Sequence, residues 1–338
     1  MNRPLLSIII PAYNASDTIA RCLDSIYKLV LKDDDYEIII IDDCSKDNTI
    51  AVIENYAKQR TNITLLCQPK NQRQGAARNR GIAIATGKYI AFVDADDEIV
   101  AKGVMKALNA IEKSNVEVCY YDFEYEMPKG QWNDFSMPLK VRNHIISAYD
   151  YLNNYYTCDY NAPWRTLYRT DFLRTCNVQF KEGVRWEDCD WTVKVYAKAK
   201  KVQFVDGVGY RYQYGENATS RQKSPEVMCE KIMAGIRLLK FSEICQIPGL
   251  QITLQEEAMH SYINAELRMR NLTKYKFKDI RDLLNKFKPN DLAYISQHTT
   301  QWLHLLTTYT TFAKLVLFFT CPIAVIGRKF MQFKRKLL

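Results

Sequence analysis

Continuous apolar runs alternate with segments of helical periodicity through the first half of this 338-residue chain, and this pattern restricts the fold more than any other feature. Strands are predicted at 5–10, 36–41, 63–67 and 88–93, with helices between them at 18–30, 48–60 and 74–85. A strand that is apolar throughout is buried on both faces, so the pattern predicts a mostly parallel α/β sheet flanked by helices. In such sheets ligands bind at the carboxyl ends of the strands.

Polar residues gather where three of these strands end. The turns are Pro11-Ala12-Tyr13-Asn14, Asp42-Asp43-Cys44-Ser45 and Asp94-Ala95-Asp96-Asp97. Capping of the second helix accounts for Asp47, but it does not account for five carboxylates at one edge. Like charges raise one another's pKa unless a cation or hydrogen-bond donors offset them, so this edge predicts a divalent metal or a ribose. The spacing of Asp94 and Asp96 suits Mg²⁺ or Mn²⁺, which prefer oxygen ligands.

Several other functions lack their signatures. No glycine follows the first predicted strand, which excludes the dinucleotide-binding fingerprint, and no P-loop sequence occurs. Of the net charge of +9, +5 lies within 328–338, and the remaining +4 does not indicate a surface that binds nucleic acid. Ten cysteines without C-x-x-C spacing and four scattered histidines give no zinc site, so reduced thiols in a cytoplasmic protein are expected.

The end of the chain has its own pattern. Residues 302–319 are apolar and aromatic, but Lys314 interrupts them and Pro322 ends them. A span needs about 20 apolar residues, so we favour a helix lying in the membrane interface, followed by a basic segment that attracts an anionic membrane surface. A true span and packing onto the rest of the protein remain alternatives. The first interpretation predicts a peripheral protein at the inner face of the cell membrane.

Two further motifs complete a family pattern. With Ala77-Arg78-Asn79 and Trp186-Glu187-Asp188-Cys189-Asp190-Trp191, the turns above resemble those of family 2 glycosyltransferases over roughly residues 4–221. The resemblance implies the GT-A fold, a Rossmann-like and mostly parallel sheet flanked by helices, here with a C-terminal helical extension. We therefore expect a catalytic domain at 1–221, divided into a nucleotide-sugar-binding half (1–114) and an acceptor half (115–221). A helical extension (222–300) and the tail (301–338) follow.

The resemblance also implies donor-binding roles. Pro11 and Tyr13 would form the floor under the base, and Asp43 would accept a hydrogen bond from the uracil N–H. Arg78 would lie near the nucleotide or its diphosphate, with an ion pair at the surface as the alternative. Asp94 would bind the ribose or share the metal.

The remaining roles concern the metal, the base and the acceptor. Asp96 would bind the Mg²⁺ or Mn²⁺ that bridges the two phosphates. Asp188 would be the catalytic base, and Glu187 would orient the loop or a ligand; acids in the first turn of a helix are the structural alternative. Among many aromatic residues, Trp164 and Trp186 are expected to line the acceptor site.

The implied activity is inverting transfer of a sugar from a nucleotide-diphosphate donor to a hydroxyl of a glycan or lipid-linked acceptor in surface polysaccharide synthesis. UDP is favoured over GDP or dTDP. A nucleotidyltransferase on a similar sheet and a non-catalytic carbohydrate-binding relative are the alternatives. The chain departs from the family pattern where Gly75 lies two places later than usual and where Thr166 replaces a lysine. Tyr210-Arg211-Tyr212 and the loop at 215–221 resemble a segment that closes over the donor.

Overall fold

The computed structural model describes residues 3–127, 130–136, 140–157, 162–213, 224–255 and 257–258. They all belong to a compact unit that ends at Ser261. The loop expected at 215–221 and the tail at 301–338 lie outside the described residues, as does the extension beyond residue 258. The predicted domain boundary after residue 221 also falls in an undescribed stretch and stays a prediction.

The described residues up to Ile244 contain ten strands and eight α-helices, and residues 248–255 are helical as well. The strands are β1 (Leu6–Ala12), β2 (Tyr36–Asp42), β3 (Ile63–Cys67), β4 (Tyr89–Phe92), β5 (Glu98–Ile99), β6 (Val118–Met127), β7 (Gln131–Phe135), β8 (Ile145–Ser147), β9 (Thr166–Arg169) and β10 (Lys201–Tyr212). The helices are α1 (Ile19–Ile26), α2 (Thr49–Ala57), α3 (Arg73–Ile84), α4 (Ala101–Ser114), α5 (Ala148–Asn154), α6 (Thr170–Cys176), α7 (Glu187–Tyr196) and α8 (Pro225–Ile244). One-turn 3₁₀ helices lie at Asp33–Asp35 and Pro163–Arg165.

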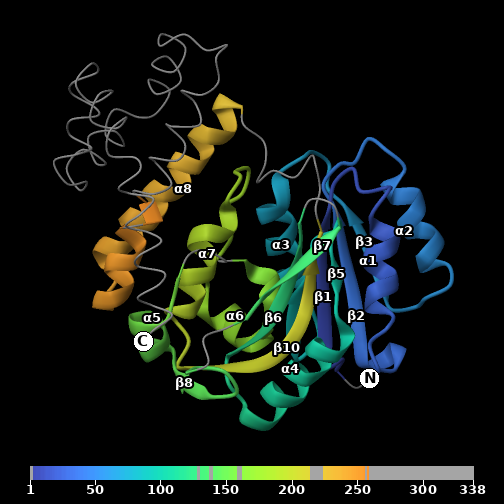
Figure 1. The fold of residues 1–338 in the computed structure, drawn as a ribbon. Coiled ribbons are helices and arrows are strands. Elements are labelled where there is room, and N and C mark those ends of the chain that lie inside the picture. The colour runs from blue at the N-terminus through green and yellow to red at the C-terminus, as the bar shows by residue number, and fades with distance from the viewer. Residues whose placement is uncertain are drawn as a thin grey trace. The chain divides into compact units, whose positions relative to one another are not determined.

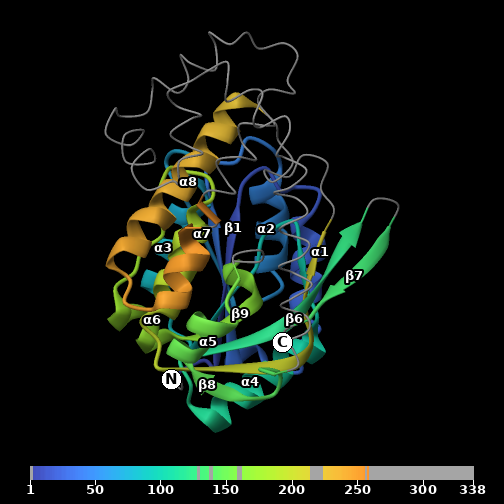
Figure 2. The ribbon, with the colours of Figure 1, turned by 60° about the vertical axis from the view of Figure 1, so that its left-hand side comes forward.

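All ten strands form one mixed sheet, with the main order β3-β2-β1-β4-β9-β6-β10-β5. Strands β3, β2, β1 and β4 are parallel to one another, which confirms the four strands and the parallel arrangement expected from the sequence. Helices α1 and α2 lie on one side of this part of the sheet, whereas α3, α6 and α7 lie on the other (Figures 1 and 2). This placement follows from right-handed crossovers, because the chain reverses its direction across the sheet after β3.

The second half of the unit is interlocked with the first. Strand β9 is antiparallel to both of its neighbours and joins β4 to β6. Strand β5, from the first half, pairs with β10 at the far edge. The two halves therefore share one continuous sheet.

The isoleucine-rich strands form the core, and α3 packs close to it. Ile38 to Ile41 are all buried, as are Ile8 to Ile10. A Cβ at Gly81 of α3 would lie 2.4 Å from Cγ2 of Ile9, so only glycine allows the helix to approach β1 this closely.

Helix α1 is shorter than the predicted helix at 18–30. The chain leaves it through turns in which Lys28 and Leu29 donate to carbonyls three residues back. Val30, which helical spacing placed on the apolar face, is 84% exposed. The short 3₁₀ helix that follows leads directly into β2, so the connection is too short for the helix to continue. At the start of α2 the N-cap residue is Asn48 and not Asp47 as the sequence predicted; Asp47 lies one position earlier and accepts the N–H of Thr49, the first residue of the helix.

Candidate active site

The polar turns after β1 and β2 meet at one edge of the sheet. The N–H of Asp43 donates to the carbonyl of Ala12, and the N–H of Asn14 donates to Oγ of Ser45. Asn14 and Cys44 have left-handed backbone conformations, with φ of 49° and 67°, which are uncommon for residues other than glycine and occur often at functional sites. Two strand ends are thus joined into one surface.

Tyr13 and Asp43 differ sharply in their surroundings. The side chain of Tyr13 is 47% exposed beside buried Pro11, so its ring is free to pack against a ligand. Asp43 is buried and accepts hydrogen bonds from Nε2 of Gln68 and from the backbone N–H groups of Gln72 and Arg73, at 2.6–2.7 Å. Burial raises its pKa, and these three donors oppose the rise. A carboxylate has about four lone-pair sites, so one further donor could be accepted.

The three carboxylates after β4 have three different environments. Asp94 accepts a hydrogen bond from Arg78. Asp97 is buried and accepts the Tyr210 hydroxyl at 2.7 Å and the Gln213 N–H at 2.8 Å; burial, and then the charges of Asp96 and Asp94, raise its pKa well above the usual value. Asp96 is exposed, and no described side chain donates to its carboxylate. Partial desolvation and the neighbouring Asp94 raise its pKa.

Arg78 connects this turn to the second acidic motif. Its Nη2 lies 2.7 Å from Oδ1 of Asp94, and its Nη1 lies 2.5 Å from Oε1 of Glu187. The side chain is only 2% exposed. Burial alone lowers the pKa of Arg78, but Asp94, Glu187 and Asp188 raise it by more, so the guanidinium stays charged. Arg78 therefore forms ion pairs, but they lie in the interior and not at the surface as the alternative interpretation had it. It joins two motifs that lie far apart in the sequence.

Asp188 lies in the first turn of α7, directly after Glu187. Its side chain is partly buried, and no described side chain donates a hydrogen bond to it. Burial, and then the charge of Glu187, raise the pKa of Asp188 to about 7, although Arg78 opposes the rise. Glu187 and Asp188 do lie in the first turn of a helix, as the structural alternative expected. The pKa of Asp188 is raised in spite of this position. Trp186, just before the helix, has a left-handed backbone with φ of 60°.

Gly75 allows this arrangement, at the position where the chain departs from the family pattern. A Cβ at Gly75 would lie 2.6 Å from the carbonyl oxygen of Lys181 and 3.2 Å from Cγ of Glu187. Only glycine therefore lets α3 lie close enough for Arg78 to reach Glu187.

The two predicted acceptor-site tryptophans occupy different positions. Trp164 is 8% exposed and stacks on Tyr210 with ring centroids 4.2 Å apart, so it is largely a packing residue. Trp186 is partly exposed, and the buried N–H of its indole finds no acceptor among the described residues. Trp186 thus has a free donor beside Glu187 and Asp188.

The family resemblance placed Tyr210 in the segment that closes over the donor, but it predicted no contact between Tyr210 and the acidic turn after β4. Its hydroxyl donates to Asp97 and accepts the N–H of Asp94, so it fixes the turn after β4. Asp97 directly follows Asp94 and Asp96, the pair that the sequence singled out. Nothing in the sequence near Tyr210 indicates that its hydroxyl contacts Asp97.

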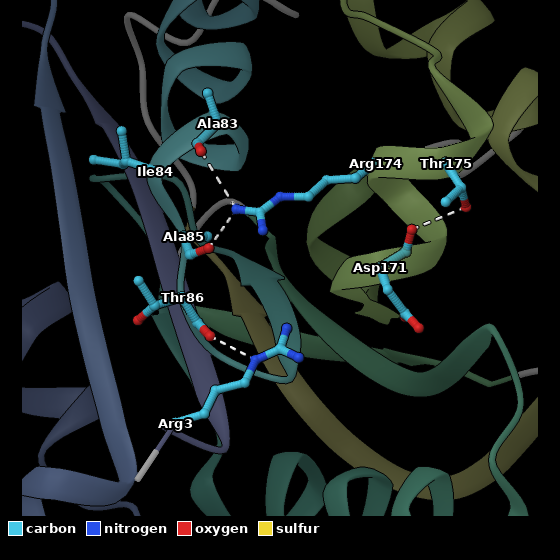
Figure 3. A pocket seen from close by; sticks show the side chains of 8 residues that line it. All are labelled: Arg3, Ala83, Ile84, Ala85, Thr86, Asp171, Arg174 and Thr175. Carbon is cyan, nitrogen blue, oxygen red and sulfur yellow. Dashed lines mark hydrogen bonds between the residues drawn. The ribbon is translucent and has the colours of Figure 1, made fainter. Parts of the chain in front are cut away.

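A cavity of about 610 Å³ lies at the opposite end of the sheet, near the start of β4 (Figure 3). Arg174 donates to the carbonyl oxygens of Ala83 and Ala85, and Arg3 donates to that of Thr86. These bonds satisfy carbonyls at the end of α3 that have no partner within the helix. The two arginines of this cavity therefore have a structural role.

Comparison with known proteins identifies the family. Residues 7–176 match the family described as "Glycosyl transferase family 2". The chain belongs to this family. It is 30% identical over 223 residues to the uncharacterized glycosyltransferase YibD of Escherichia coli, covering 64% of this chain and 63% of YibD. It is 25% identical to poly(ribitol-phosphate) beta-N-acetylglucosaminyltransferase TarS of Staphylococcus aureus, covering 65% of this chain and 38% of TarS. The chain thus spans less than two thirds of these curated relatives.

Solved structures confirm the GT-A fold of this family 2 chain. TarS residues 1–349 in complex with UDP-GlcNAc superpose with a TM-score of 0.64 at 20% identity, covering 88% of this chain and 82% of that one. The mannosyltransferase PcManGT of Pyrobaculum calidifontis, in complex with GDP-Man and Mn²⁺, gives a TM-score of 0.56 at 15% identity, covering 88% and 85%. Within the described residues, no helix is both long and apolar enough to cross a membrane.

Proposed function

We propose that this chain is an inverting glycosyltransferase that moves a sugar from UDP to an acceptor hydroxyl. The observation that carries the proposal is the buried Arg78, which fixes Asp94 at the end of β4 and Glu187 at the start of α7. This bridge holds the turn after β4 beside the start of α7, which supports a shared site for the donor and the base in a family 2 chain. The UDP-GlcNAc bound by TarS favours UDP over the alternatives.

Asp188 would act as the base. In the transfer step, the acceptor oxygen forms a bond to the anomeric carbon while the bond from that carbon to the diphosphate oxygen breaks on the opposite face. The hydroxyl proton passes to Asp188. A pKa of about 7 suits this task, because a general base works best when its pKa lies near the operating pH. Glu187 would keep the loop in place through Arg78.

Asp96 would bind Mg²⁺ or Mn²⁺. Of the three carboxylates after β4, it alone is exposed and receives no hydrogen bond from a described side chain. No group of three acidic, histidine or cysteine side chains that could hold a metal is found among the described residues, which fits an ion whose other ligands are phosphate oxygens and water. When bound, the cation neutralises the charge that develops on the leaving diphosphate.

Donor contacts would come from the joined turns. The exposed ring of Tyr13, beside Pro11, would support the uracil, and Asp43 would use its remaining lone-pair site for the imide N–H. Asp94, with one oxygen bound by Arg78, would accept a ribose hydroxyl through the other. On the acceptor side, the partly exposed ring of Trp186 would pack against a sugar near Asp188, while Trp164 would contribute mainly through packing.

The acceptor would be a glycan or lipid-linked intermediate of a surface polymer, at the inner face of the cell membrane. The activity of TarS on poly(ribitol-phosphate) supports the polymer class, and the basic sequence at 328–338 supports the location.

A donor screen tests the function. Purified protein with Mn²⁺ is offered UDP-, GDP- and dTDP-sugars, and the released product is identified. We expect nucleoside diphosphate from a UDP-sugar, abolished transfer in Asp188→Asn with donor binding retained, and loss of Mn²⁺-stimulated UDP binding in Asp96→Asn. Release of pyrophosphate would indicate a nucleotidyltransferase. Binding of sugars without any release would indicate a non-catalytic relative.

A further inference from the structure

Helix α8 contacts the loop that precedes the proposed base. Nε of Arg237 lies 2.7 Å from Oδ1 of Asp190, and its Nη2 lies 2.8 Å from the carbonyl oxygen of Trp186. One side chain of α8 therefore binds the start of α7 at two points. Trp186 lies two positions before Asp188, and Asp190 lies two positions after it. Helix α8 lies beyond residues 7–176, the part of the chain that matches the family.

The bound loop has a conformation that needs external support. Trp186 has φ of 60°, a backbone conformation that is unfavourable for a bulky residue and persists only where its surroundings impose it. Its carbonyl accepts from Arg237, and Asp190 is buried between Arg237 and Lys194. Arg237 thus stabilises both the strained residue and the first turn that carries Asp188.

A second contact from α8 lies on the same loop. Glu230 accepts from Nη1 of Arg185 at 2.8 Å and lies 3.4 Å from Nη2 of Arg73. Arg73 begins α3, the helix that also carries Arg78. Helix α8 therefore contacts the loop before α7 and the first residue of the helix that carries Arg78, and both contacts are charge-assisted.

We propose that Arg237 is a positioning residue for Asp188, and that α8 is thereby required for transfer. The inference rests on the proposed function. It predicts that loss of Arg237 displaces the base without removing any group that touches the donor. Displacement of a reacting group by about 1 Å can cost about 100-fold in rate. The turnover number should fall, while the Michaelis constant for the donor should change little.

Kinetics of Arg237→Ala, Arg237→Lys and the control Lys240→Ala test the proposal. Lys240 is an exposed residue of the same helix. We expect kcat to fall about 10- to 100-fold in Arg237→Ala with donor KM within about twofold, partial recovery in Arg237→Lys, and no change in Lys240→Ala. A kcat for Arg237→Ala equal to that of the wild type would overturn the proposal.

The pH profile separates positioning from a general loss of stability. Asp188 faces Glu187 on its own helix, Arg78 of α3 and Asp94 after β4. A loosened loop admits water to the carboxylate, which lowers its pKa, so the acid limb of kcat in Arg237→Ala should move to lower pH. If unfolded protein alone explained the lower rate, the limb would stay in place, and the positioning role would be wrong.

Hydrogen exchange gives a readout that needs no substrate. In Arg237→Ala, amides of 185–191 should exchange at least about tenfold faster than in the wild type, while the amides of α3 keep their rates. Unchanged exchange at 185–191 would overturn the proposal even if activity fell. Failure of the proposed function would instead appear as a wild-type protein that turns over no nucleotide sugar.

Discussion

Replacing Asp188 by asparagine should stabilise the protein while it abolishes transfer. The pKa of this carboxyl rises from an ordinary value of 3.8 to about 7 in the folded protein. Between these values the native state binds more protons than the unfolded state, so stability falls as the pH rises from about 4 to about 7. Above pH 7 the charged carboxylate imposes its full cost, and the neutral amide of asparagine removes that cost.

The structure sets the size of the effect. A tenfold difference in proton affinity corresponds to about 1.4 kcal/mol, so the rise gives an upper bound of about 4 kcal/mol. Asp188 is only partly buried, and water at its exposed side reduces the cost, so we expect about 2 kcal/mol at pH 8. For a unit of this size, that corresponds to an increase in Tm of about 4–8 °C.

Thermal unfolding at pH 8 and pH 4 is the assay. The Tm of Asp188→Asn should exceed that of the wild type at pH 8, and the difference should nearly vanish at pH 4. Glu187→Gln is the matched control, because the same change one residue earlier removes a partner of the buried Arg78 and should destabilise the protein by about 1–3 kcal/mol. A Tm for Asp188→Asn at or below the wild-type value at pH 8 would refute the reasoning.

Three further substitutions test other parts of the site. Gly75→Ala should destabilise the protein by about 1–3 kcal/mol and lower kcat, because its methyl group would meet the carbonyl of Lys181. Urea unfolding measures the stability and initial rates measure kcat; a variant as stable as the wild type would contradict the close contact between Gly75 and Lys181. Tyr210→Phe should cost about 1–3 kcal/mol in urea unfolding, since it deprives buried Asp97 of a donor; no loss would mean that the hydroxyl does not stabilise the turn. Tyr13→Ala should weaken UDP binding about tenfold by calorimetry, at the low end of base–aromatic stacking, with an unchanged Tm; equal affinity would remove Tyr13 from the base site.

The strands and the acidic edge could be predicted because their signals are local. The apolar runs at 36–41 and 63–67 gave β2 and β3 to within one residue, and parallel strands necessarily bring their ends to one edge. The end of α1 was harder, because Val30 has the spacing of a buried residue and yet follows the helix in an exposed turn. Periodicity records which residues are apolar and does not show where a connection must turn.

The contacts that assemble the site could not be predicted in this way. Arg78 and Glu187 are separated by 109 positions, and their pairing depends on how α3 packs against α7. The resemblance placed both residues in the site but gave no reason for Arg78 to be buried. The same limit applies to Arg237, whose sequence surroundings show an ordinary helix. Its partners become visible only once the loop before α7 is placed.

The position of β9 has a consequence for how the chain can fold as it is made. Strand β4 ends at Phe92, but its neighbour β9 begins at Thr166, so one side of β4 has no partner until 74 further residues have been synthesised. At about 5–20 residues per second, this interval lasts about 4–15 s. During that time a buried, apolar strand presents an open edge, which is the kind of surface that pairs with other chains. Nascent chains that stall between these two strands should therefore be the ones that most need a chaperone.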